Sequence, residues 1–234
     1  GSNILAQYRN FAESFTRNLD EPIDQVTQFR IVNEIVSNLP QTDIIKTTPI
    51  KDIIATIGQA KSARLNADDL KKIAEDNLKD SAEISERVSD VLSQIKPRCK
   101  FDQGVDFYLQ VANILSEYIS PVPITQNIER EVNIMLRDLH KVIEKEQQSE
   151  KPSISPLTAW RNSYFNKDKK NHYRLSNFIA NKKLLSLAFI MDSYEKFLEE
   201  NELFDFSDMI EESIKILKTD DAFRFTLRER YQYI

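Results

Sequence analysis

Residues 151–183 form the one segment of this sequence whose composition suggests a binding role. Eight lysines and arginines stand there against a single acid, Asp168, in a chain of 234 residues with a formal net charge of −5. Cations that neutralise phosphates, next to rings that can stack on bases, are what a nucleic-acid contact needs. The rings interleaved with the charges are Trp160, Tyr164, Phe165, His172 and Tyr173. We predict nucleic-acid contacts from Arg161, Lys167, Lys169, Lys170, Arg174, Lys182 and Lys183.

The same composition also fits a solvated loop in which Trp160 and Phe165 are buried anchors. The sequence that follows is acidic, with twelve acids and six bases between Ser186 and Ile234. Such a flank repels phosphate and would confine a DNA contact to one side of the domain. Both interpretations stay open at this level.

Other constellations that could do chemistry are missing. Gly58 and Gly104 are isolated, so the sequence contains no Gly-x-x-x-x-Gly-Lys-Ser/Thr loop to cradle phosphates. Cys99, His140 and His172 are far apart and show none of the spacings typical of metal ligands. We therefore predict no catalytic residue, no metal site and no cofactor in this chain, which alone should be inactive.

The elements that must position these residues are predicted to be helices. Only three glycines occur, which disfavours the tight hairpins of a sheet-rich fold. Apolar residues recur at helical spacing along most of the chain, and no convincing strand is visible. The fold class expected is all-α, an irregular multi-helix domain. Helices are expected over residues 4–19, 26–39, 48–60, 66–95, 104–119, 127–148, 156–165, 176–200, 206–218 and 220–230.

The remaining bulk properties concern the compartment. Cys99 is the only cysteine, so an intramolecular disulfide is impossible and a reducing compartment is indicated. No apolar run reaches the ~18–20 residues that span a bilayer, and no signal peptide opens the chain. We expect a cytoplasmic protein without a membrane partner.

The last forty residues resemble the segment that precedes the Walker B strand in UvrD/Rep/PcrA-type superfamily 1 DNA helicases. That family carries Leu-x-Asp-Phe-x-Asp-Met/Leu-Ile/Leu, then a helix, then Arg-Tyr-x-Tyr/His-Ile. The residues that match the first pattern are Leu203, Asp205, Phe206, Asp208, Met209 and Ile210, and those that match the second are Arg230, Tyr231, Tyr233 and Ile234. The resemblance implies a chain that ends just before the Asp-Glu pair that would hold magnesium.

The first eighty residues show a looser resemblance to the same helicases. The matching positions are Asp24, Gln28, Val32, Glu34 and Ile35, followed by the segment 54–61. Ser62 stands where the family usually has Asn. The resemblance implies that Lys61 lies where the subdomain approaches duplex DNA, although a lysine at a helix C-terminus also complements the helix dipole.

Asp205 and Asp208 invite a catalytic role because the resemblance places them near the missing magnesium site. Helix capping is the better interpretation. Asp205 precedes a predicted helix and suits its N-cap, and Asp208 would stand at the third helical position, which the dipole favours for an acid. We predict both as structural caps.

The resemblance implies a division into three parts and a function. Residues 1–80 would be the N-terminal part of helicase subdomain 1B, residues 81–190 an enlarged helical insert with the basic segment 151–183, and residues 191–234 helices that lead to the Walker B strand. The parent would be an ATP-dependent 3′–5′ DNA helicase that uses ATP and Mg²⁺. Its partners would be a single-strand/duplex DNA junction and the remaining helicase domains. The alternative is a helical protein–protein interaction module of a DNA repair protein, whose insert binds a partner and never touches DNA.

Overall fold

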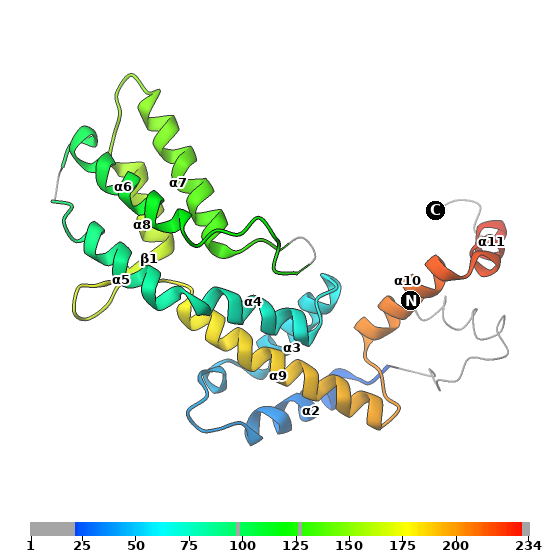
Figure 1. Cartoon of the computed structure of the whole chain (residues 1–234). Coiled ribbons are helices and arrows are strands. Elements are labelled where there is room, and N and C mark those ends of the chain that lie inside the picture. Colours follow the sequence, from blue (N-terminus) through cyan, green and yellow to red (C-terminus); the bar gives the residue numbers. More distant parts are fainter. Residues whose placement is uncertain (1–21, 97–98, 126–127, 231–234) are drawn as a thin grey trace. The chain divides into compact units, whose positions relative to one another are not determined.

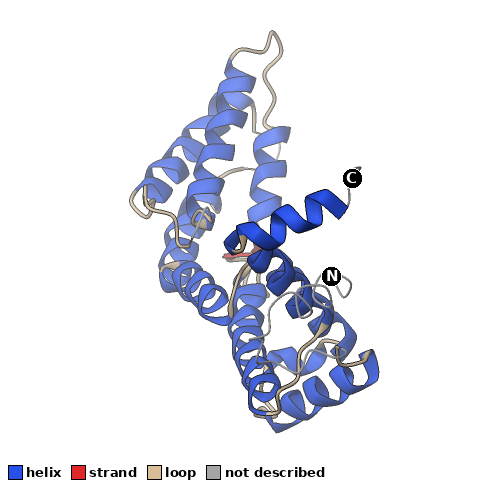
Figure 2. Cartoon of the chain, turned by 90° about the vertical axis from the view of Figure 1, so that its right-hand side faces the viewer, coloured by secondary structure: helices blue, strands red, loops and turns tan. Residues whose placement is uncertain are grey.

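The computed structural model describes residues 22–96, 99–125 and 128–230 (Figure 1). Helices dominate these residues, and the strands among them form one two-stranded sheet (Figure 2). The predicted all-α fold class is confirmed. The helix expected over residues 4–19 lies outside the described residues, as do Tyr231, Tyr233 and Ile234.

The chain divides into two compact units. Residues 1–67 and 186–234 form the first, and residues 68–185 form the second. The sequence-based division places its borders at 80/81 and 190/191 instead. The identification of these parts with helicase subdomain 1B and its insert stays a prediction.

The first unit is built from helices of both ends of the chain. It holds α2 (Gln25–Asn38), the short 3-10 helix η1 (Ile44–Thr47), α3 (Ile50–Ser62), the second part of α9 (Phe178–Glu200), α10 (Phe206–Thr219) and α11 (Asp221–Arg230). Helix α3 begins one residue later than expected: Pro49, expected at the first helical position after a Thr48 cap, occupies the N-cap position itself. Helices α3, α10 and α11 pack in that order, with α2 also on α3.

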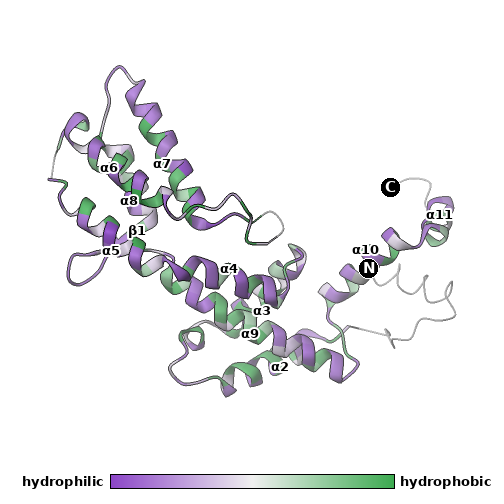
Figure 3. Cartoon of the chain, viewed as in Figure 1, coloured by the Kyte–Doolittle hydropathy of each residue, from purple (hydrophilic) through white to green (hydrophobic). Residues whose placement is uncertain are grey.

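The second unit surrounds a larger apolar core. It holds α4 (Ala67–Lys79), α5 (Ser81–Leu92), α6 (Phe101–Ser116), α7 (Glu131–Gln147), α8 (Ser155–Tyr164), strands β1 (Phe165–Lys167) and β2 (Tyr173–Leu175), and the first turns of α9. Most of its helices show apolar residues along one side and polar residues along the other (Figure 3). The side chains at its centre are fully enclosed, among them Val88, Tyr108, Leu115, Leu139 and Leu157.

The single helix expected over residues 66–95 is two helices. Asp80 leaves the helical region, with φ −104° and ψ 3°, and the hydroxyl of Ser81 donates to the carbonyl of Leu78 at 2.9 Å. Aspartate and serine side chains compete in this way for backbone groups and favour helix ends. The prediction of one long helix was wrong for this local reason.

Trp160 on α8 links three elements of the second unit. It is 4% exposed, and its indole Nε1 donates to the carbonyl of Met135 on α7 at 3.1 Å. Its ring meets Tyr108 of α6 edge-on, with the centroids 6.2 Å apart, and lies 6.0 Å from the ring of Phe165. The basic segment is therefore attached to the core through its aromatic residues.

A buried charge network joins four helices of the first unit. The ammonium of Lys61, at the end of α3, donates to the carboxylates of Asp205 and Asp208 at 3.0 and 2.6 Å. The hydroxyl of Tyr194 on α9 donates to Asp205 at 3.1 Å and accepts from the amide of Gln28 on α2 at 3.1 Å. The lysine side chain is 4% exposed, and so is the Asp205 side chain.

Asp205 and Asp208 also form the capping box of α10. Asp205 is the N-cap and accepts from the Asp208 amide at 2.9 Å, while Asp208 accepts from the Asp205 amide at 3.0 Å. Burial alone would lower the pKa of the Lys61 ammonium, but the two carboxylates outweigh this effect and raise it. The lysine therefore stays charged and balances the capping residues.

Replacing Trp160 with Ala should lower the free energy of unfolding by about 3–5 kcal/mol, because a large enclosed ring is removed from the core. Trp160→Phe keeps part of the ring and should cost clearly less. Denaturant unfolding of both variants measures the difference. Equal stability of Trp160→Ala and the unmodified chain would show that this ring is not an anchor.

Replacing Lys61 with Met should cost about 3–5 kcal/mol, because Asp205 is left as a buried charge without its cation. The matched control is Lys196→Met. It breaks an exposed pair of α9, Lys196–Asp192 at 2.7 Å, and should cost less than about 1 kcal/mol. Urea unfolding compares the two, and similar losses would mean that the buried network adds little.

Glu195, on α9 beside this network, should make stability depend on pH. Burial raises the pKa of its carboxyl above the ordinary 4.5, and the nearby aspartates add to the shift against the attraction of Lys61. The folded state therefore holds the proton more tightly than the unfolded state, so stability falls as pH rises through the raised pKa. The variant Glu195→Gln cannot ionise. Its stability relative to the unmodified chain should increase as pH rises above 4.5, and a pH-independent difference would contradict this.

Candidate nucleic-acid interface

The centre of the basic segment is a β-hairpin that the sequence did not reveal. Strands β1 and β2 pair antiparallel, with Phe165 opposite Leu175 and Lys167 opposite Tyr173. Each strand has only three residues and alternates once between buried and exposed, which is too short a pattern to detect. The expectation of a structure without strands was wrong at this point.

The loop of the hairpin is fixed by its own polar groups. The Asp168 amide donates to the His172 carbonyl at 2.8 Å, and the Asn171 amide donates to the Asp168 carbonyl at 3.0 Å. The Asp168 carboxylate accepts from the amides of Lys170 and His172. Asn171 has φ 65°, a left-handed conformation that asparagine tolerates better than most residues. The hydrogen bond from the His172 amide, with smaller help from Lys170 and Arg174, lowers the pKa of the Asp168 carboxyl.

The hairpin is held on α5 by serine hydroxyls. On the outer edge of β2, the Tyr173 amide donates to the Ser89 hydroxyl at 3.0 Å, and the Leu175 amide donates to the Ser85 hydroxyl at 3.2 Å. Together with Ser81, these serines recur every fourth residue, and all three are buried. Serines repeated at helical spacing along the predicted helix 66–95 were the available signal for this contact, and the sequence-based prediction did not use it.

The cations of the hairpin face solvent. Lys167, Lys169, Lys170 and Arg174 are exposed, and Arg174 pairs with Asp168 at 3.4 Å. The three lysines have no carboxylate partner among the residues that the structure describes. Their charge is therefore available to an external anion.

Two cations lie over the ring of Tyr173. The guanidinium of Arg161 on α8 lies 5.3 Å from the ring centroid, and the ammonium of Lys167 lies 4.9 Å from it. Cations over an aromatic face are attracted by its quadrupole. The structure thus brings Arg161 to the hairpin, where four of the other predicted DNA-binding residues stand.

The other predicted site residues lie elsewhere. Lys182 is on the second turn of α9, with its ammonium 4.6 Å from the ring centroid of Phe178, and Lys183 follows it. Lys61 belongs to the buried network of the first unit, so a direct contact with phosphate would require breaking two ion pairs. Its contact with DNA stays a prediction.

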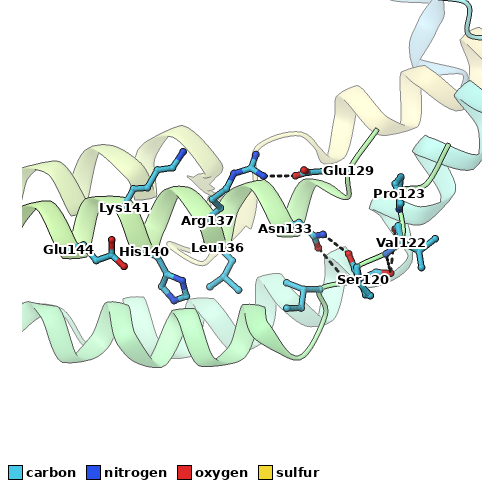
Figure 4. Close-up of a pocket in the computed structure, with 12 residues that line it drawn as sticks. Ser120, Val122, Pro123, Glu129, Asn133, Leu136, Arg137, His140, Lys141 and Glu144 are labelled. Atoms are coloured by element: carbon cyan, nitrogen blue, oxygen red, sulfur yellow. Dashed lines mark hydrogen bonds and ion pairs between the residues drawn. The ribbon is translucent and has the colours of Figure 1, made fainter. Parts of the chain in front are cut away.

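A hollow lies in the same unit, away from these cations. It has a volume of about 920 Å³ and is lined by the loop 119–123 and by α7. Leu136 and His140 of α7 line it, as does Arg137, which points to the other side of the helix from them and pairs with Glu129 at 2.7 Å (Figure 4). Because its charges are mixed and part of its lining is apolar, this hollow is not suited to phosphate.

Two features are absent from the parts of the chain described, a metal-ligand cluster and a membrane-spanning helix. Residues 22–96, 99–125 and 128–230 contain no cluster of three His, Cys, Asp or Glu side chains that could hold a metal ion. None of the helices within these ranges has the length and apolar character needed to cross a membrane.

The comparison with protein families concerns the second half of the chain. Residues 125–234 match the model of the UvrD/REP helicase N-terminal domain. The searches of curated proteins and of solved structures each found no significant match. The matched residues include the basic hairpin, the Asp205–Asp208 capping box and the segment on which the resemblance to helicases rests. The match makes this part of the chain similar to the N-terminal domain of UvrD/REP helicases.

Proposed function

We propose that this chain is an accessory DNA-engaging subdomain of an ATP-dependent DNA helicase, and that the hairpin 165–175 is its DNA contact. One observation carries the proposal: the ammonium groups of Lys167, Lys169 and Lys170 are exposed on a loop that Asp168 holds in one conformation. Because the backbone that carries them is already ordered, little backbone conformational freedom is lost when a phosphate arrives. Arg161 and Arg174 add charge at the base of the hairpin.

The intact parent would translocate 3′ to 5′ on single-stranded DNA in the cytoplasm, with ATP and Mg²⁺ bound by its other domains. This chain would then correspond to subdomain 1B with its insert, and would help to hold the duplex at the junction with the single strand. The resemblance and the family match support this larger context, and the hairpin supports the DNA contact within it.

A protein-interaction module is the second candidate, and the hollow beside α7 favours it. Ile119 and Val122 at its rim are 47% and 68% exposed. Apolar side chains that remain in water next to a hollow are typical of protein contact sites. In this case the hollow would bind a repair partner and the hairpin cations would be a solvated surface.

Reversing the charge of Lys167, Lys169 and Lys170 to Glu should remove most DNA binding by the chain. The unmodified chain should bind weakly and without sequence preference, with Kd on the order of 10⁻⁴–10⁻⁶ M. Each phosphate contact on duplex DNA should contribute about 0.9 to the slope of log affinity against log salt, so the slope should also flatten. Fluorescence anisotropy over a salt series measures both quantities.

The matched control reverses three exposed lysines of α4, Lys71, Lys72 and Lys79, in the same unit. The change in net charge is the same, so only the position of the cations differs. The control should keep most of the affinity and its salt slope. Equal losses of DNA affinity in the two variants would mean that net charge alone explains the binding. An unchanged affinity in the hairpin variant would favour the interaction module.

A further inference from the structure

The rings of the basic segment are engaged inside the protein. Trp160, Phe165 and Tyr173 are 4%, 2% and 5% exposed. Trp160 and Phe165 pack against each other with their centroids 6.0 Å apart. A ring that is enclosed in the core has no free face for a nucleobase.

The partly exposed rings are engaged as well. The Tyr164 hydroxyl donates to the Asp138 carboxylate at 2.8 Å, and its ring lies 5.6 Å from that of Trp160. The face of Phe178 is covered by the ammonium of Lys182 at 4.6 Å. Among the rings of residues 151–183, His172 alone stands exposed, at the end of the hairpin loop.

One ring of the segment, that of Tyr173, lies against two of its cations. Tyr173 faces Arg161 and Lys167, within 5.3 Å and 4.9 Å of its centroid. The same residue anchors β2 to α5 through its amide. The rings other than His172 pack in or against the core or face a cation, so the exposed side chains of the hairpin are its cations together with the polar residues Asn166, Asn171 and His172.

We infer that the hairpin binds the sugar–phosphate backbone of DNA and does not stack on its bases. This inference rests on the proposed function, because it defines what part of the DNA the same site takes. Stacking on an aromatic residue strengthens single-strand binding by roughly 5- to 150-fold per base. A surface on which His172 is the one exposed ring lacks most of this gain, and its affinity follows the number of phosphates neutralised.

The decisive ligand is a DNA strand without bases. The complete 234-residue chain is titrated with fluorescently labelled oligothymidylate and with an abasic strand of the same length, in a salt series. We expect the two affinities to agree within about twofold and their salt slopes to coincide, because the phosphates are the same. Replacing Lys169 and Lys170 with Glu should lower the affinity for both ligands equally.

His172→Ala is the matched test of the one exposed ring, and it should leave both affinities unchanged. A preference for oligothymidylate of fivefold or more, or a loss confined to oligothymidylate in His172→Ala, overturns the inference and leaves the DNA contact in place. If neither strand binds at low salt, the proposed DNA contact fails together with the inference.

Discussion

The structure around the candidate interface depends on one constraint, which is that a hairpin of two three-residue strands cannot persist in water by itself. Here it is stabilised from the side. Phe165 and Tyr173 insert one face into the core, and Ser85 and Ser89 of α5 accept from the outer amides of β2, which would otherwise be buried without partners. The edge of the sheet is thereby covered, so the pairing persists although Lys167 and Arg174 of the two strands are exposed.

In the first unit, four helices from distant parts of the chain pack together. Their common point is the charged group of Lys61, Asp205 and Asp208, in which the capping box of α10 is neutralised by a lysine from α3. A buried pair costs desolvation, so its net stabilisation is smaller than its short distances suggest. Its value lies in specificity, because an alternative arrangement of these helices would leave a charge without a partner. Tyr194 and Gln28 extend the same hydrogen-bonded network to α9 and α2.

The sequence predicted what periodicity controls. The described helices follow the apolar repeat closely, and α10 and its cap begin where Asp205 indicated. What failed depends on single hydrogen bonds, between distant residues for the strands and between near neighbours for the helix break. The strands β1 and β2 have no pattern of their own and form because α5 offers hydroxyls to them, 84 and 90 residues earlier in the chain. The break at Asp80 coincides with a hydrogen bond from the Ser81 hydroxyl to the Leu78 carbonyl, which the apolar repeat cannot predict. For the candidate site, the cations could be found from composition, whereas their gathering on one hairpin could not.

The alternation of aromatic and basic residues in such a segment has two physical meanings, and only burial separates them. In a single-strand groove the rings stay in water until bases cover them. In this hairpin the core covers Trp160 and Phe165, and Tyr173 offers its face to Arg161 and Lys167. Aromatic faces hold cations at an energy of about 0.5–1 kcal/mol at exposed sites, which is enough to bias the rotamers of long side chains. The ring of Tyr173 thus restricts where the charges of Arg161 and Lys167 stand, and under the proposed function a DNA strand would meet these two cations already positioned.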